Sequence, residues 1–140
     1  MTEKTLVRVD RLIVNDQHER QFLQLQEAEP GPEGERRSLT IVIGPAEAGE
    51  ISRGLTGVRT TRPLTHELLS RVVQALGARI AEVHIHDLRE GVYFATLVLE
   101  HQGERLELDC RPSDGVALAL RAGAPVYLAP RLFREGNEPG

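Results

Sequence analysis

Hydrophobic and polar positions alternate along several short stretches of the chain, and a period of two is typical of strands with one buried face. Residues 5–14 and 21–28 show this pattern first, and they are expected to pair as a hairpin around Asn15-Asp16-Gln17-His18. A polar loop rich in Pro and Gly at residues 29–36 leads to a third strand at Ser38–Ile43. Later strands are expected at residues 80–87, Tyr93–Glu100, Arg105–Cys110 and Pro125–Leu128.

Apolar positions three and four apart predict helices between these strands. A short helix is expected at about residues 46–55. A second helix is expected to begin at Thr65, and a third is expected at about residues 114–122, with Thr65 and Ser113 as the capping residues. The glycines expected just past the three helix ends are Gly57, Gly77 and Gly123. The second helix carries one apolar face, made of Leu68, Leu69, Val72, Val73 and Leu76.

A short internal echo adds to the fold prediction. Three residues of the first half recur at a constant offset of 67 residues in the second half: Leu39, Pro45 and Glu47 correspond to Leu106, Pro112 and Asp114. Both segments read strand, proline, acidic residue, helix and glycine, either by duplication or by shared turn chemistry. We predict an α+β fold with a mixed, mostly antiparallel sheet, about three helices and two similar strand–helix units. The compact domain is expected over residues 1–134, with a flexible polar tail at 135–140.

Composition narrows the function without deciding it. The 140 residues fit one domain, and 21 acidic against 17 basic residues give a net charge of −4. A dedicated non-specific DNA-binding protein usually has a basic surplus, so this balance counts against that class. One cysteine excludes an intrachain disulfide, and the apolar runs are too short to span a membrane. Since the N-terminus also lacks a signal-peptide core, the cytoplasm is the expected compartment.

Two polar motifs stand at the predicted helix starts. They are Arg62-Pro63-Leu64-Thr65-His66-Glu67 and Asp109-Cys110-Arg111-Pro112-Ser113-Asp114. A helix N-terminus has unpaired N–H groups and partial positive charge, and an adjacent arginine adds a planar donor suited to phosphate. The two motifs therefore predict a site for an anionic ligand.

Individual side chains in and near these motifs have candidate roles. Asp109 ends a strand and Asp114 opens a helix, and carboxylates in such places can hold Mg²⁺ or Mn²⁺ for phosphodiester hydrolysis. Glu47, in the echoed position, could supply another carboxylate. His66 is either a general base or phosphate contact, or a plain surface histidine on a capped helix. The cations expected nearest an anion are Arg62, Arg111 and Arg121.

Three further residues have mainly structural interpretations. His84 and His86 lie two apart on a predicted strand and share one face, which can begin a metal site. An exposed polar face of a half-covered sheet is the favoured interpretation. Cys110 has no catalytic partner by spacing and is expected in the core.

Four segments occur in an order and spacing that resemble one family. They are Ile43–Ala48, Arg62–Leu69, Asp109–Ala119 and Ala124–Tyr127. On these segments the chain resembles the bifunctional nuclease domain family, from about Leu6 to Leu132. The resemblance implies a compact α+β domain and, from plant members of the family, nuclease activity on RNA and DNA. Small departures occur at Cys110 and Gly115, where the family more often shows Ala, and these are expected to leave the backbone undisturbed.

A metal-assisted nuclease acting on RNA or DNA is therefore the first functional hypothesis, with Mg²⁺ or Mn²⁺ as the ion. In-line attack on a phosphodiester needs charge neutralisation at the phosphate and an activated water. The expected catalytic residues are His66, Asp109 and Asp114. The expected metal ligands are Glu47, Asp109 and Asp114.

The alternative hypothesis is a non-catalytic module that binds a protein or a small anion. In that case the polar motifs only begin helices and pair internally, which the negative net charge supports. A homodimer is expected under either hypothesis, because a small sheet leaves unpaired edges and cyclic dimers are common. No membrane association is expected.

Overall fold

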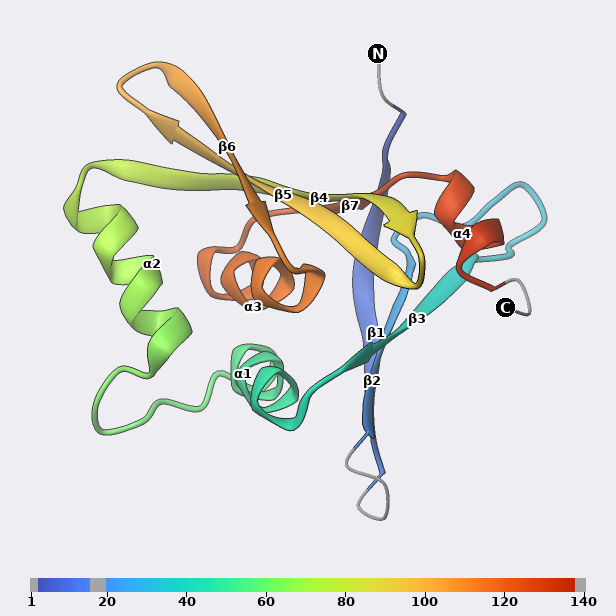
Figure 1. Cartoon of the computed structure of the whole chain (residues 1–140), viewed down its shortest axis with the longest axis horizontal. Coiled ribbons are helices and arrows are strands. Elements are labelled where there is room, and N and C mark those ends of the chain that lie inside the picture. The colour runs from blue at the N-terminus through green and yellow to red at the C-terminus, as the bar shows by residue number, and fades with distance from the viewer. Residues whose placement is uncertain (1–2, 16–19, 138–140) are drawn as a thin grey trace.

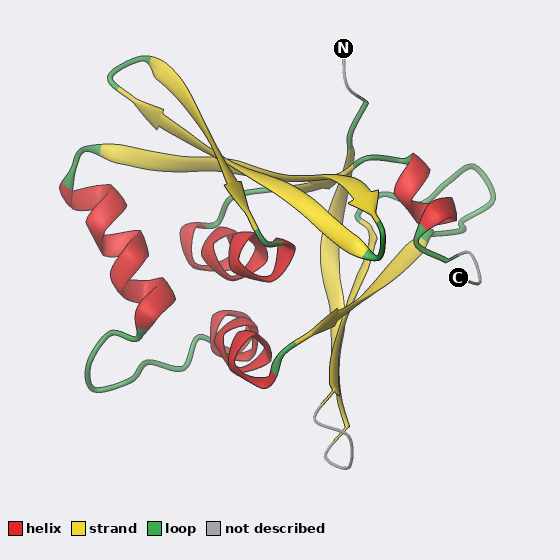
Figure 2. Cartoon of the chain, viewed as in Figure 1, coloured by secondary structure: helices red, strands yellow, loops and turns green. Residues whose placement is uncertain are grey.

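The computed structural model describes residues 3–15 and 20–137 and shows a seven-stranded mixed sheet with four helices (Figure 1, Figure 2). The strands are β1 (Thr5–Asn15), β2 (Arg20–Glu27), β3 (Ser38–Ile43), β4 (Ala78–Arg89), β5 (Val92–His101), β6 (Glu104–Cys110) and β7 (Val126–Leu128). The helices are α1 (Pro45–Thr56), α2 (Thr65–Ala75), α3 (Pro112–Ala122) and α4 (Arg131–Glu135). The sheet order is β3-β2-β1-β7-β4-β5-β6, with β4 and β7 parallel and the other pairs antiparallel. The predicted α+β class is confirmed.

Two similar units make up most of the described chain. In each, an antiparallel meander of three strands leads into a helix, as β1–β2–β3–α1 and as β4–β5–β6–α3. Both helices begin with a proline, Pro45 and Pro112, and both end at a glycine with a left-handed backbone, Gly57 and Gly123. Strand β7 joins the units by pairing with both β1 and β4. The predicted pair of strand–helix units is thus present in the fold.

The predicted elements lie within two residues of the observed boundaries. Alternation predicted the strands, while apolar spacing, capping residues and glycines predicted the helix ends. Strands β1 and β2 pair antiparallel as expected, while residues 16–19 of the predicted hairpin turn lie outside the described residues.

Helix α4 follows β7 and was not predicted. It buries Phe133 in the core, and Asn137 then donates hydrogen bonds to the carbonyl oxygens of Ser38 and Phe133. Ordered contacts therefore continue to Asn137, past the domain boundary expected at residue 134. Residues 138–140 of the expected tail lie outside the described part of the chain.

The predicted capping residues are wrong. Leu64 occupies the N-cap position of α2, so Thr65 is already helical. Arg111 occupies the N-cap position of α3, because Pro112 fixes a helical φ one residue before Ser113. The described helices α1, α2 and α3 all lack a side-chain capping hydrogen bond. The first-turn N–H groups of α1 and α3 are therefore left without a capping side chain.

The expected apolar face of α2 is largely exposed. Among its five residues only Val73 is buried, while the others expose between 44% and 70% of their surface. Helix α2 packs on α3 and β4 through a narrow strip that includes Ser70 and Val73. The helical period was correct, but the extent of burial was not. The homodimer expected from the unpaired sheet edges stays a prediction. No helix within the described residues is long and apolar enough to cross a bilayer.

Helices α1 and α3 lie side by side in the angle between the two meanders (Figure 1). Their close approach depends on Gly54, where an added Cβ would lie 3.1 Å from Leu120 Cβ. The core joins both meanders to these helices. Its fully buried side chains include Leu23, Leu25, Leu39, Ile51, Val83, Ile85, Leu118 and Leu128. This packing brings the N-terminal ends of α1 and α3 together.

Gly115 lies where α3 packs directly against the sheet. A Cβ at this position would lie 2.7 Å from Val83 Cγ1 and 3.2 Å from Cys110 Sγ. Gly115→Ala is therefore expected to lower the free energy of unfolding by about 1–3 kcal/mol, as overpacking does. Chemical denaturation measures the change.

Gly49→Ala provides the matched control for this substitution. It makes the same change inside α1, where the nearest atom to the new Cβ is Arg53 Nη1 at 3.4 Å. With no clash, higher helix propensity is expected to stabilise the protein by about 0.5–1 kcal/mol. A Gly115→Ala variant as stable as wild type would contradict the packing described for α3.

Candidate active site

Side chains of the two predicted motifs meet where α1, α2 and α3 begin. His66, the second residue of α2, places Nε2 at 2.8 Å from Asp114 Oδ1 in the first turn of α3. Arg111, just before α3, places Nη1 at 2.9 Å from Glu47 Oε1 in the first turn of α1. Two motifs far apart in the sequence, and the echoed glutamate, thus converge in space.

Arg111 bridges two carboxylates at the surface of this group. Its Nε donates to Asp114 Oδ2 at 2.9 Å and its Nη2 to Asp114 Oδ1 at 3.2 Å, while Nη1 faces Glu47. The Arg111 side chain is 63% exposed, whereas those of Glu47 and Asp114 are 17% and 29% exposed. The guanidinium therefore covers two half-buried carboxylates and presents its outer edge to solvent.

His66 lies between two carboxylates. Beyond its contact with Asp114, its Nδ1 is 3.7 Å from Glu50 Oε2 and has no hydrogen-bond partner in the described part of the chain. Burial opposes ionisation of Asp114, but hydrogen bonds from Arg111 and His66 outweigh it, so the pKa of Asp114 lies below its usual value. The His66 side chain is only 13% exposed. Its link to the exposed Arg111 therefore runs through the Asp114 carboxylate.

Glu50 forms a buried ionic centre behind His66. Its side chain is 8% exposed and accepts a hydrogen bond from Arg53 at 2.7 Å, with Arg121 at 3.5 Å. Burial raises the pKa of Glu50, but the hydrogen bond and charge of Arg53, then the charges of His66 and Arg121, lower it below the usual value. We call the following residues the helix-start cluster: Glu47, Glu50, His66, Arg111, Asp114 and Arg121.

Asp109 does not join the helix-start cluster. Its neighbour Cys110 faces α3, since Cys110 Sγ lies 3.2 Å from the Cβ position of Gly115. Successive residues of a strand point to opposite faces, so Asp109 lies on the other face of the sheet, opposite Thr96 on β5. The sequence placed Asp109 beside Asp114, but the pleat of β6 separates them.

The two other predicted arginines differ in position. Arg62 is exposed in the loop between α1 and α2, and no ion pair holds it within the described residues. Arg121, in the last turn of α3, is 16% exposed and lies between Glu50 and Glu67. Arg121 therefore neutralises the buried Glu50 and the half-buried Glu67. Among the predicted cations, Arg111 both belongs to the helix-start cluster and is exposed.

His84 and His86 share one region of β4, with ring centroids 5.7 Å apart. Burial, and then the charge of His86, lower the pKa of His84. Within residues 3–15 and 20–137, no three His, Cys, Asp or Glu side chains converge in an arrangement suited to a metal ion. The pair thus has no third ligand in the described structure.

A cavity of about 460 Å³ opens beside the helix-start cluster. It lies between the edge strand β3, the β4–β5 turn and the starts of α1 and α3. Most of its lining is apolar, and Glu47, Arg111 and Ser113 supply polar groups at one side. The remaining lining residues are Ile41, Val42, Ile43, Gly44, Gly91, Val92, Tyr93 and Pro112.

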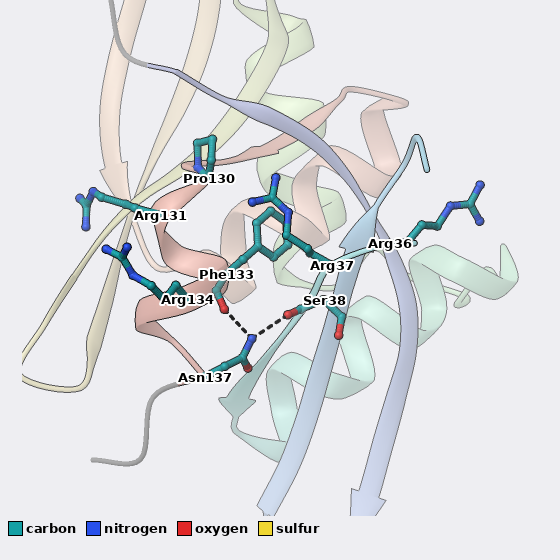
Figure 3. A pocket seen from close by; sticks show the side chains of 8 residues that line it. All are labelled: Arg36, Arg37, Ser38, Pro130, Arg131, Phe133, Arg134 and Asn137. Atoms are coloured by element: carbon teal, nitrogen blue, oxygen red, sulfur yellow. Dashed lines mark hydrogen bonds between the residues drawn. The ribbon is translucent and has the colours of Figure 1, made fainter. Parts of the chain in front are cut away.

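A larger cavity of about 690 Å³ lies at the other end of β3, beside α4 (Figure 3). Arginines surround it, but their charges are largely matched. Arg37 pairs with Glu27 and lies 4.6 Å above the ring of Phe133, and Arg131 pairs with Asp87 and Glu135. None of the predicted site residues lines this cavity.

The expected metal ligands fit a divalent cation only in part. With Asp109 on the opposite face, Glu47 and Asp114 remain, and their hard oxygens suit Mg²⁺ or Mn²⁺ when a substrate phosphate adds ligands. The Arg111 guanidinium already contacts one oxygen of Glu47 and both oxygens of Asp114. A cation between these carboxylates therefore requires the guanidinium to move.

Sequence reasoning missed Glu50. It looks like an ordinary helical glutamate, and nothing beside it in the sequence marks a site. A usable signal was present, because Glu47, Glu50 and Arg53 recur every three residues and so share one helix face. An ionic face on a helix that packs in the core indicates buried partners.

The fold and the cluster together define an α+β domain with an exposed arginine over two carboxylates, a composition suited to phosphate-bearing ligands. The family model of the bifunctional nuclease domain matches residues 31–139. The chain belongs to the bifunctional nuclease domain family, as its motifs predicted.

Individual relatives differ in what is known of them. An uncharacterized protein of Mycobacterium tuberculosis is 40% identical over 101 residues, which cover 72% of this chain and 60% of that protein. Bifunctional nuclease 1 of Oryza sativa subsp. japonica is 24% identical over 97 residues, covering 67% of this chain and 29% of the plant protein. Bifunctional nuclease 2 of Arabidopsis thaliana is 25% identical over 93 residues, which cover 64% of this chain and 28% of that protein. The matched part of the chain thus spans about 60% of the mycobacterial relative and under a third of the plant proteins.

Proposed function

We propose that the chain is a nuclease that hydrolyses phosphodiester bonds of RNA or DNA at the helix-start cluster. The observation that carries the proposal is Arg111, an exposed guanidinium fixed by Glu47 and Asp114 at the meeting point of α1 and α3. Family membership and the plant relatives named bifunctional nuclease support the reaction class.

The proposed chemistry begins with charge. Free N–H groups of Arg111 bind a non-bridging phosphate oxygen, and the uncapped first turns of α1 and α3 add partial positive charge. Negative charge that builds up on phosphorus during attack by water is then matched by groups already in position. Arg111 thus serves as the phosphate-binding residue.

Asp114 is the proposed water-orienting residue, and His66 its positioning partner. The low pKa of Asp114 keeps the carboxylate ionised, so that it accepts a hydrogen bond from the attacking water. His66 holds Oδ1 of Asp114, and the proton released by water passes into this carboxylate–imidazole pair. The P–O bond to the leaving ester oxygen breaks as the new P–O bond forms, and the leaving oxygen takes up a proton from this pair or from solvent. Mg²⁺ or Mn²⁺ is a further proposal: Glu47 and Asp114 would hold the ion with the substrate phosphate once the Arg111 guanidinium has moved off these carboxylates, and the ion would neutralise phosphate charge there.

A non-catalytic anion- or protein-binding module is the second candidate. Every charged side chain of the helix-start cluster has an oppositely charged neighbour inside it, as a purely structural network requires. The two candidates differ in what the exposed Arg111 does. A structural network predicts no activity at all, whereas the nuclease predicts cleavage that depends on this arginine.

Cleavage of labelled single-stranded RNA and DNA tests the proposed function. Purified protein is incubated with Mg²⁺, with Mn²⁺ and with EDTA across a range of pH. The nuclease predicts products that grow with enzyme concentration, and the EDTA arm decides whether a metal takes part. No cleavage of either substrate under any of these conditions would contradict the proposal.

Asp109→Asn is expected to leave this cleavage within about twofold of wild type. The side chain lies on the face of the sheet opposite the helix-start cluster, so it cannot contact a phosphate on Arg111. The measurement is kcat/KM on the same labelled strands. A loss of tenfold or more would place Asp109 at the site and contradict the geometry described above.

A further inference from the structure

We propose that the 460 Å³ cavity beside Arg111 is a binding site for one unpaired nucleobase, next to the phosphate that is cleaved. The inference rests on the proposed function and names the form of its substrate. A nuclease with such a site acts on single strands, because a base must leave its stack to enter a pocket.

The walls of the cavity suit the flat face of a base. Val42 on β3 and Val92 at the start of β5 line it and remain 59% and 56% exposed, although both are apolar. Ligand pockets usually combine such apolar walls with a few polar groups that orient the ligand. Tyr93 also lines the cavity, although its hydroxyl lies beside Gly136, away from the other lining residues.

Position links the cavity to the helix-start cluster. Glu47 and Arg111 belong to both, so a phosphate on the Arg111 guanidinium lies at the mouth of the apolar cavity. In a nucleotide the phosphate and the base are joined through a single sugar. A ligand that satisfies the arginine and the apolar walls together is therefore a nucleotide unit of a strand.

The open edge of the sheet gives a strand access. Strand β3 is the last strand of the sheet, and no other strand of the described chain pairs with its outer side. The substrate can therefore reach Val42 from solvent without a rearrangement of the fold. The arginine-lined cavity at the far end of β3 offers no comparable apolar wall next to a cluster residue.

Binding of a labelled single-stranded oligonucleotide that contains one abasic position tests the proposal. Fluorescence anisotropy in EDTA compares this strand with its intact counterpart, and cleavage at the neighbouring bond is measured in parallel. Wild type is expected to bind or cleave the abasic strand about tenfold less well, in line with the loss of one stacked base. The Val42→Ser/Val92→Ser variant is expected to treat both strands alike.

Val14→Ser is the matched control, because Val14 is 60% exposed on β1 and lines no described cavity near the cluster. It is expected to keep the wild-type discrimination. Equal handling of abasic and intact strands by wild type, or discrimination that survives in the double variant, would overturn the proposal. If wild type binds the intact strand better than the abasic strand but cleaves neither, the base site stands and the nuclease is rejected. If wild type cleaves both strands equally, the nuclease stands and the base site is rejected.

Displacement of the labelled strand identifies the occupant independently. A nucleoside monophosphate is expected to compete in wild type and to compete at least fivefold less well in the double variant. N-acetyl-leucinamide is expected not to compete. Competition by the leucine derivative at the concentrations where the nucleotide acts would identify a peptide side-chain pocket and overturn the proposal.

Discussion

Arg111→Ala is expected to lower kcat/KM for single-stranded substrates by about 100- to 1,000-fold, the usual effect of losing one donor to a developing oxyanion. Its effect on the free energy of unfolding is expected to stay below about 1 kcal/mol, because the side chain is 63% exposed and its ion pairs face solvent. Initial cleavage rates and chemical denaturation measure the two quantities.

Arg79→Ala is the matched control for this prediction. Arg79 is 65% exposed and pairs with Glu100 on the neighbouring strand, so it is also a surface arginine in an ion pair. It is expected to retain wild-type kcat/KM and stability. If Arg111→Ala loses stability and activity in proportion, the arginine is structural, and the non-catalytic interpretation of the cluster is favoured.

Glu50→Gln is expected to destabilise the fold by about 3 kcal/mol, the lower end of the range for breaking a buried ion pair. The 8% exposed carboxylate faces Arg53, Arg121 and His66, and neutralising it leaves two arginines without their buried counter-charge. For a chain of this size the melting temperature should fall by about 10 °C. Thermal unfolding monitored by circular dichroism measures this shift.

The effect of Glu50→Gln should also depend on pH. The folded pKa of Glu50 lies below the usual 4.5, so its ionised form stabilises the fold above that pH, and this contribution disappears as pH falls through the folded pKa. The difference between wild type and variant is therefore expected to be largest near neutral pH and to shrink in acid. Glu107→Gln is the control, because Glu107 is 62% exposed, and it should change stability little at any pH. A constant difference across pH would contradict an ionic role for Glu50.

Local sequence signals predicted the element boundaries because those boundaries depend on local physics. Strand β3 was predicted with its observed ends, since its alternation ends directly before Gly44-Pro45. The capping residues failed for a local reason as well. Pro112 starts α3 one residue before the preferred cap at Ser113, and a rule based on cap side chains alone did not weigh that.

Features that depend on tertiary packing were beyond the sequence. The apolar face of α2 gives its helical period, but only the contact area with α3 and β4 determines that Val73 alone is buried. Asp109 and Asp114 are close in sequence, yet the pairing register of β6 sends them to opposite faces. His66 and Asp114 meet only because α2 folds back onto α3, and no spacing rule predicts that contact.

The central claim is that the helix-start cluster cleaves phosphodiester bonds. The most direct test is a side-by-side cleavage assay of wild type, Arg111→Ala and Asp109→Asn on labelled single-stranded RNA, with folding of each variant checked by circular dichroism. The account predicts equal cleavage by wild type and Asp109→Asn and almost none by Arg111→Ala. Equal cleavage by all three proteins, or none by wild type, would contradict it.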